Sequence, residues 1–253
     1  MKEIVNELDP GRAVTQALFR PSDSGDITGD TRTILDVFGG NYRTDEVIEA
    51  MGMAPARAGL ITEIGTDTSG WDDVMSHDAL TGLFLWTGAD HLGEANGEWP
   101  TVGASPGIID AVGTVKDIGY SWQSVWGAPE TPPPATGNSA SQIALTAERD
   151  RVSTDVNDIV YVRATVTDSS GNVVTDSSAS ITFRVDGPGV IVAVDSGSQE
   201  NESFRGDVRK AYQGIAYALV RATDSGTITV SASASDLSEG STTIDGATEP
   251  AVF

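Results

Sequence analysis

The sequence contains no cysteine, which excludes disulfide scaffolds, thiolate metal sites and cysteine nucleophiles. Histidine is almost as scarce: with only His77 and His91, a histidine-rich metal cage is excluded as well. No apolar run is long enough to cross a bilayer, and the residues after Met1 lack the apolar core of a secretory signal. We therefore expect no metal, no cofactor and no membrane partner. The compartment stays open, with the cytoplasm slightly favoured.

Positive charge is also in short supply. The chain has 15 Lys and Arg against 37 Asp and Glu, which gives a formal net charge of −22. Both halves share the excess: residues 1–127 carry 7 basic and 20 acidic side chains (−13), and residues 128–253 carry 8 and 17 (−9). Such a chain is not expected to bind nucleic acid or anionic lipid, since both need a basic face. An acidic binding surface is one interpretation. We favour adaptation to concentrated salt, as in a halophile, because salt screens the self-repulsion.

A cluster of four prolines between residues 128 and 139 divides the chain. Consecutive prolines favour an extended spacer and interrupt helices and central strands. All five tryptophans and all four methionines precede this cluster, whereas Ser, Thr, Val and Asp dominate after it. The sequence therefore predicts four segments: a first domain, a proline-rich linker, a second domain and a tail, at residues 1–127, 128–139, 140–245 and 246–253.

The second domain alternates apolar and polar side chains with the period of half-buried strands. Turns rich in Asp, Ser and Gly separate about seven such strands, which are short and closely spaced. This pattern predicts an immunoglobulin-like β-sandwich. The expected inward-facing residues of three runs are Val160, Val162, Ala164 and Val166; Ile181, Phe183 and Val185; and Ile228, Val230 and Ala232.

The first domain alternates helices and strands. A helix is expected to end near Leu8 and another to begin at Thr44. Apolar strands separated by helices indicate a parallel sheet that helices cover. Four strands form only half of a barrel or an incomplete open sheet, so we expect exposed edges and an apolar layer for a partner to cover. The expected strands are residues 13–19, 33–40, 58–65 and 82–90.

The stretch from Gly82 to Trp126, which begins GLFLWTGADHLGE and ends WQSVW, closely resembles the end of the catalytic barrel in family 2 glycoside hydrolases of the β-galactosidase type. Upstream, LDPGRAVTQAL, LDVFGGNY and LITEIGT follow the order of that family's last barrel strands. The runs ITFRVDGPGVIVAVDSG and RKAYQGIAYALVRATDSG resemble its C-terminal immunoglobulin-like domain. The resemblance implies an α/β plus all-β chain: the second half of a (β/α)8 TIM barrel followed by an immunoglobulin-like β-sandwich.

The resemblance also assigns roles to five residues. Glu63, in LITEIG, takes the place of the catalytic nucleophile at the end of the seventh barrel strand, and barrel active sites lie at such strand ends. Tyr42 takes the place of a tyrosine that hydrogen-bonds this nucleophile. Trp86 takes the place of the tryptophan that forms the apolar floor under the sugar. This residue type suits the role, because pyranose C–H faces stack on aromatic rings. Asp90 and His91 are implied as sugar contacts or as supports of such contacts.

The family's acid/base glutamate, in an Asn-Glu pair after the fourth strand, would precede Met1 together with the first half of the barrel. We therefore expect a retaining glycosidase for terminal β-linked sugars such as β-galactosides, inactive without a complementary chain that carries the N-terminal half of the barrel. One alternative is a catalytically inactive carbohydrate-binding or immunoglobulin-like assembly module. Another is a Ca²⁺-binding adhesive module that uses acidic loops around Asp150, Asp155 and Asp158.

Overall fold

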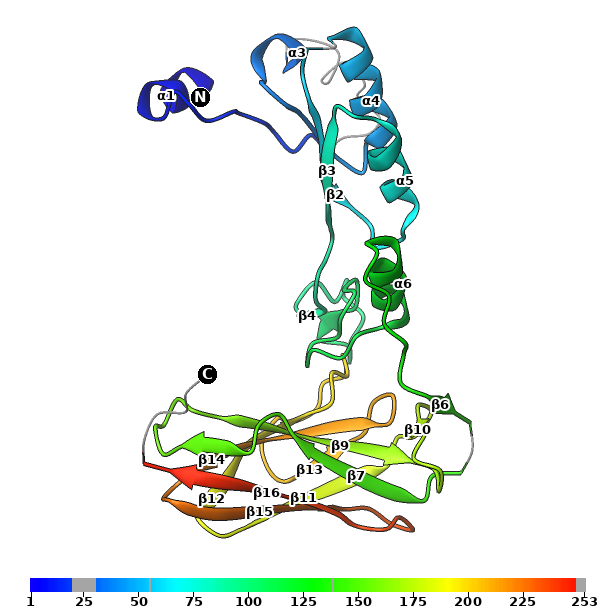
Figure 1. Ribbon diagram of the computed structural model, residues 1–253, viewed down its shortest axis with the longest axis vertical. Helices are drawn as coiled ribbons and strands as arrows, with labels where there is room; N and C mark the ends of the chain where they lie inside the picture. Colours follow the sequence, from blue (N-terminus) through cyan, green and yellow to red (C-terminus); the bar gives the residue numbers. More distant parts are fainter. Residues whose placement is uncertain (20–30, 55, 138, 249–253) are drawn as a thin grey trace. The chain divides into compact units, whose positions relative to one another are not determined.

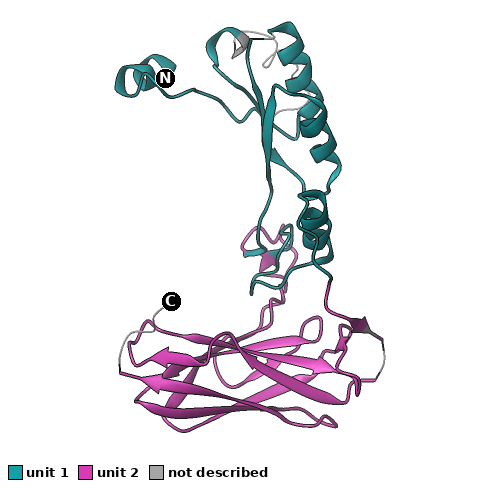
Figure 2. Ribbon diagram, viewed as in Figure 1, with its two compact units in different colours: residues 1–91, 104–131 teal, residues 92–103, 132–253 magenta. Residues whose placement is uncertain are grey.

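The structure is a computed structural model that describes residues 1–19, 31–54, 56–137 and 139–248 (Figure 1). Most of its secondary structure is β-sheet, and its helices are few and short. The chain forms two compact units: unit 1 is residues 1–91 and 104–131, and unit 2 is residues 92–103 and 132–253 (Figure 2). Within the described ranges, no helix has the length and apolar character needed to span a membrane.

Unit 1 alternates short helices with parallel strands. The helix expected to end near Leu8 and the helix expected to begin at Thr44 are both confirmed. Two further strands, β4 (His91–Leu92) and β5 (Gly103–Ala104), form a separate pair at the two ends of the 92–103 segment. The elements are α1 (Lys2–Leu8), α3 (Thr31–Ile34), β1 (Phe38–Asn41), α4 (Thr44–Met53), β2 (Gly59–Ile64), α5 (Ser69–Ser76), β3 (Leu80–Leu85) and α6 (Asp117–Val125).

The sheet of unit 1 has the order β1-β2-β3, and both pairings are parallel, as the sequence predicts. The strand expected over residues 13–19 is wrong. This segment makes a single parallel bridge, between Leu18 and Gly40. A strand needs repeated pairing with its neighbour, which the segment does not make with β1. The strand expected over residues 33–40 begins only at Phe38, after α3.

Helices cover one face of this sheet. Val47, Ala50 and Met51 of α4 are buried against strand residues that include Ile61 and Leu80. Figure 1 shows α4 and α5 on the same side of β2 and β3. This amphipathic arrangement explains the burial, because apolar residues three to four positions apart share one helix face. On β3, by contrast, the Phe84 side chain is 61% exposed.

Unit 2 is a β-sandwich with two antiparallel-dominated sheets. One sheet has the order β12-β14-β9-β10-β6, with β7 also paired to β9, and the other has the order β13-β11-β15-β16-β8. Ala135 and Thr136 lie in the segment predicted as a proline-rich linker, yet they form β6 and pair with β10. The bounds are β6 (Ala135–Thr136), β7 (Gln142–Ala147), β8 (Arg151–Ser153), β9 (Val160–Thr167), β10 (Val173–Val174), β11 (Ser180–Asp186), β12 (Gly189–Asp195), β13 (Val208–Lys210), β14 (Ile215–Ala222), β15 (Gly226–Ser233) and β16 (Gly240–Ala247).

The sandwich core contains side chains from both sheets, as strand alternation requires. The inward-facing set predicted for β9 is fully buried, and so are the sets of β11 and β15, except that Val185 is only partly buried. Arg209 on β13 is the one buried cation of this core among the described residues. Its guanidinium contacts Asp195, Glu202 and the Ser196 hydroxyl at 3.1–3.3 Å.

Candidate active site

The ends of β1, β2 and β3 bring three of the predicted site residues to one edge of the sheet. Tyr42 follows β1, Glu63 is the penultimate residue of β2, and Trp86 follows β3. The Tyr42 amide donates to the Glu63 carbonyl (2.7 Å), and the Trp86 amide donates to the Ile64 carbonyl (2.7 Å). Because the strands are parallel, these residues share their carboxyl edge, which is where barrel and open α/β sheets hold their active sites.

An irregularity in the β1–β2 pairing decides where Glu63 points. Gly40 pairs with Ile61 and Asn41 pairs with Glu63, so the pairing skips Thr62. Such a β-bulge changes the face to which the next side chain points. Ile61 is buried in the core with α4, whereas Thr62 and Glu63 both contact Asn41. The bulge therefore gives Glu63 the face that regular alternation would assign to its neighbour.

Asn41 links these two side chains. Its Nδ2 donates to Glu63 Oε2 at 3.2 Å, and its Oδ1 accepts from the Thr62 hydroxyl at 2.8 Å. An amide held from both ends in this way helps to orient the Glu63 carboxylate through Oε2. Our sequence analysis missed Asn41, although it lies in the GGNY motif. Its position at the end of a strand beside Tyr42 was the available signal.

Aromatic rings lie at the same edge. Trp86 is 40% exposed, and its ring meets that of His91 edge-on, with centroids 6.0 Å apart. Tyr42 is also exposed, and its ring lies 6.1 Å from that of Phe19 in the same geometry. Exposed ring faces beside a carboxylate offer an apolar surface and a charged group together, which is a combination that suits a sugar.

The backbone of Tyr42 has a φ of +57°, in the left-handed region that non-glycine residues seldom adopt. Residues held in this region occur preferentially at functional sites, where surrounding contacts over-determine them. Here the amide hydrogen bond to Glu63 is one such contact. The turn at Tyr42 is therefore built together with the end of β2.

Asp90 is placed differently from an exposed sugar contact. Its side chain is only 5% exposed, and its carboxylate accepts from Lys116 Nζ (3.0 and 3.2 Å) and from the Gly107 amide (2.7 Å). The carboxylate thus faces the protein. Lys116 was also missed by our sequence analysis, yet a chain with 37 acidic residues and only three lysines gives each lysine more weight.

Asp110 is a second buried acid in the same region. Burial raises the pKa of its carboxyl, and the amides of Thr114 and Val112, which donate to Oδ1 at 2.7 and 3.0 Å, oppose this rise. The negative charge of Asp90 adds to the increase. Because its oxygen closes a turn over residues 110–114, Asp110 shapes the chain that leads to Lys116.

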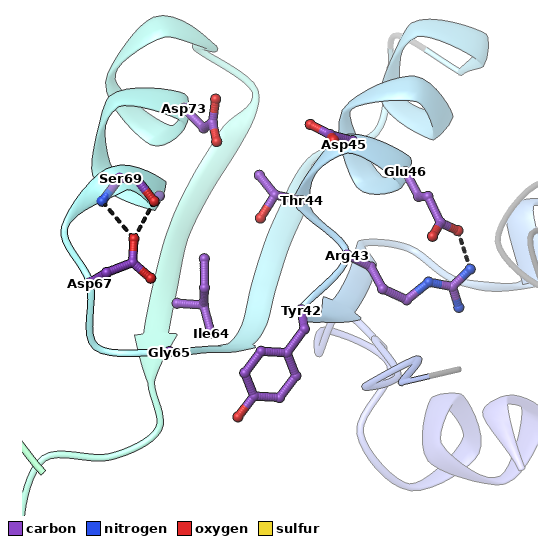
Figure 3. A pocket seen from close by; sticks show the side chains of 11 residues that line it. Tyr42, Arg43, Thr44, Asp45, Glu46, Ile64, Gly65, Asp67, Ser69 and Asp73 are labelled. Atoms are coloured by element: carbon purple, nitrogen blue, oxygen red, sulfur yellow. Dashed lines mark hydrogen bonds and ion pairs between the residues drawn. The ribbon is translucent and has the colours of Figure 1, made fainter. Parts of the chain in front are cut away.

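A hollow of about 550 Å³ lies between the first turns of α4 and α5 (Figure 3). Neither Glu63 nor Trp86 lines it. Asp67, at its edge, accepts from the hydroxyl and amide of Ser69, which lowers the pKa of the Asp67 carboxyl. The hollow is acidic, and Arg43, the only cation in its lining, pairs with Glu46. The lining is Tyr42, Arg43, Thr44, Asp45, Glu46, Ile64, Gly65, Asp67, Ser69, Gly70 and Asp73.

In the acidic loops considered for calcium, the Asp155 and Asp158 carboxylates already accept hydrogen bonds from the protein. Asp158 pairs with Arg149 and accepts from the Ser153 amide (2.6 Å), and Asp155 accepts from the Asn157 amide (2.8 Å). Across the described ranges, no three or more His, Asp or Glu side chains are grouped so that they could hold a metal ion. These contacts give the loop a structural explanation.

Known proteins resemble this chain in sequence and fold. Residues 143–243 match the family model "Glycoside hydrolase family 2 C-terminal domain 5". The β-galactosidase BoGH2A of Bacteroides ovatus is 21% identical over 337 aligned positions, which cover 86% of this chain and 39% of that protein. A family 2 glycosyl hydrolase from Bacteroides cellulosilyticus has a similar fold, with a TM-score of 0.82, 19% identity, and coverage of 97% of this chain and 46% of its own.

A β-glycosidase from Bacteroides vulgatus gives a TM-score of 0.78 at 17% identity and covers 96% of this chain and 48% of its own. The chain therefore spans between about two fifths and one half of the length of these proteins. At such identities the structural matches show the fold. The family match covers most of the sandwich and agrees with the β-sheet architecture of unit 2. Residues 143–243 are thus similar to a C-terminal domain of glycoside hydrolase family 2, and the chain is similar in sequence to a β-galactosidase and in fold to family 2 enzymes.

Proposed function

We propose that this chain is the nucleophile-bearing part of a retaining glycoside hydrolase that acts on terminal β-linked sugars such as β-galactosides. The observation that carries the proposal is the common edge at which Tyr42, Glu63 and Trp86 end three parallel strands, joined by backbone hydrogen bonds. In this proposal residues 1–127 form the second half of a TIM barrel, and residues 140–245 form an immunoglobulin-like sandwich after a short linker.

The proposed chemistry gives each residue one task. Glu63 Oε1 attacks the anomeric carbon and the glycosidic bond breaks, while an acid protonates the departing oxygen, which leaves a glycosyl ester on Glu63. The same acid, now a base, then takes a proton from water, and the water oxygen displaces Glu63. Asn41 holds the Glu63 carboxylate through Oε2, and Trp86 supports the apolar face of the sugar.

The acid/base residue is proposed to come from outside these 253 residues. A retaining mechanism needs a second carboxylate about 5–5.5 Å from the nucleophile. Asp90 cannot fill this role, because its carboxylate is buried against Lys116 and Gly107. Phe84 on β3 is a large apolar residue that is exposed, which is what we expect of a surface that a complementary half of the barrel covers. The alignment with the β-galactosidase BoGH2A covers 39% of that protein, so most of that enzyme has no counterpart in these residues, which supports the same view.

The test combines complementation with covalent trapping. The chain is mixed with a polypeptide carrying the upstream half of a family 2 barrel, and turnover of p-nitrophenyl β-galactoside is measured. The mixture is then treated with 2-deoxy-2-fluoro-β-galactosyl fluoride. Its leaving group departs without an acid, and its fluorine slows hydrolysis of the ester, so the glycosylated peptide can be identified by mass spectrometry.

We expect turnover only in the mixture, and a label on the peptide that contains Glu63. Glu63→Gln should abolish both, whereas Glu49→Gln, the same change at an exposed position of α4, should leave both intact. A label on another carboxylate would overturn the assignment of Glu63. Sugar binding without turnover or label would instead support the inactive carbohydrate-binding module.

A further inference from the structure

The loop after β3 is held along its whole length by one neighbouring segment. From Thr87 to Asp90 the backbone exchanges hydrogen bonds with residues 106–109, including Ile108 to the Gly88 carbonyl (3.1 Å) and Asp90 to the Ile109 carbonyl (2.9 Å). Trp86 and His91 lie immediately before and after this loop, and their rings meet at 6.0 Å. The position of both rings therefore depends on how the loop is held.

The Asp90 carboxylate joins three parts of the chain at this loop. It accepts from the Gly107 amide at 2.7 Å and from Lys116 Nζ at 3.0 and 3.2 Å. Lys116 also donates to the Ser105 carbonyl at 2.9 Å and precedes the first residue of α6. A charge-assisted hydrogen bond to a nearly buried carboxylate is stronger and more directional than one at the surface.

Gly107 shows how closely these segments approach. A Cβ atom at this position would lie 2.3 Å from the Asp90 nitrogen and 2.5 Å from the Ile109 carbonyl oxygen. Both neighbours are backbone atoms that cannot rotate away. Only glycine therefore allows the Gly107 amide to reach the Asp90 carboxylate in this arrangement.

We infer that Asp90 is a positioning residue: with Lys116 and Gly107 it fixes loop 87–90, and through the loop it sets the placement of the Trp86 and His91 rings. The link to a sugar site rests on the proposed function, but the effect on Trp86 does not. The ion pair brings together residues 26 positions apart, on the loop after β3 and just before α6. Its loss releases the loop, and β2 and Glu63 keep their own hydrogen bonds.

The test follows the five tryptophans of the full chain by ¹⁹F NMR after incorporation of 5-fluorotryptophan, with Trp86→Phe and Trp122→Phe each identifying one resonance. We expect Asp90→Asn and Lys116→Met to shift or broaden the Trp86 resonance, while that of buried Trp122 stays unchanged. The matched control is Asp9→Asn, which breaks the exposed Asp9–Arg12 pair and should leave all five resonances in place.

The double variant Asp90→Asn/Lys116→Met separates positioning from simple stabilisation. It has no unpaired buried charge, so its melting temperature should exceed that of Lys116→Met. Its Trp86 resonance should nevertheless stay displaced, because the connection to the loop is missing. An unchanged Trp86 resonance in the single variants, or its return in the double variant, would overturn the inference. So would equal shifts of all five resonances.

A second readout applies to the complemented enzyme. There Asp90→Asn should reduce kcat/KM by roughly 10- to 100-fold, the range expected when a site group is misplaced by about 1 Å, while Glu63 is still labelled by the fluorosugar. If complementation yields no turnover, the proposed function fails and the NMR result still decides the role of Asp90. If turnover is restored and Asp90→Asn leaves it unchanged, the positioning role fails alone.

Discussion

Trp122 on α6 is expected to secure the chain that follows Glu63. Its side chain is fully buried, and its Nε1 donates to the Thr66 carbonyl at 2.7 Å. Its ring packs edge-on against Trp71 of α5 at 6.3 Å and contacts Trp126 at 5.0 Å. Trp122→Phe keeps an aromatic ring but removes the donor and part of the ring volume, so it tests this anchoring directly.

The magnitude follows from three losses in this substitution. The partly buried Thr66 carbonyl left without its donor costs at most about 1–3 kcal/mol. The smaller ring leaves a cavity, at a cost below the roughly 3–5 kcal/mol of a complete Trp-to-Ala truncation. Weakened ring contacts contribute about 0.5–1.5 kcal/mol each. These terms overlap, and together we expect a loss of about 2–4 kcal/mol in the free energy of unfolding of unit 1.

Urea unfolding followed by tryptophan fluorescence measures this loss, because four of the five tryptophans belong to unit 1. With a slope of about 2 kcal/mol/M, the midpoint should fall by roughly 1–2 M. Trp126→Phe, at a position 47% exposed, is the matched control and should cost less than half as much. A midpoint for Trp122→Phe equal to that of the parent chain would refute the anchoring role.

Two further predictions concern charge. Arg209→Met should lower the free energy of unfolding of the sandwich by about 2–3 kcal/mol, because it leaves Asp195 and Glu202 without their cation; far-ultraviolet circular dichroism in urea measures this loss. Arg184→Met removes a pair exposed to solvent and should have a much smaller effect, and equal effects of the two substitutions would contradict the reasoning. The melting temperature of the full chain should rise between 0.05 and 3 M KCl, since salt screens a net charge of −22; a flat or falling midpoint would contradict the salt-adaptation interpretation.

The strand pattern of the sandwich could be predicted from the sequence because it is local. Side chains two positions apart lie on one face of a strand, so the alternation around Val162 and Val230 identifies the buried face without knowledge of the partner strand. The end of an apolar strand is similarly local, which is why Glu63 could be placed at a strand end. The strand expected over residues 82–90, however, spans Leu80–Leu85, so Trp86 follows the strand and does not lie within it. The strand predicted over residues 13–19 was wrong, because apolar content alone does not provide the repeated pairing with a neighbouring strand that a strand needs.

Tertiary structure decided the features that depend on contacts between distant residues. The bulge that skips Thr62 arises from the register between β1 and β2, and no periodicity within β2 reveals that Glu63 then meets Asn41. The ion pair of Asp90 with Lys116 joins positions 26 residues apart. It forms where the backbone at Gly107 approaches that of Asp90 too closely for any side chain at position 107. The sequence thus determined which residues line the sandwich core, because that pattern repeats along a single element. Only the packed chain determined which side chains hold them in place, because hydrogen bonds and ion pairs between elements follow from their relative positions in space.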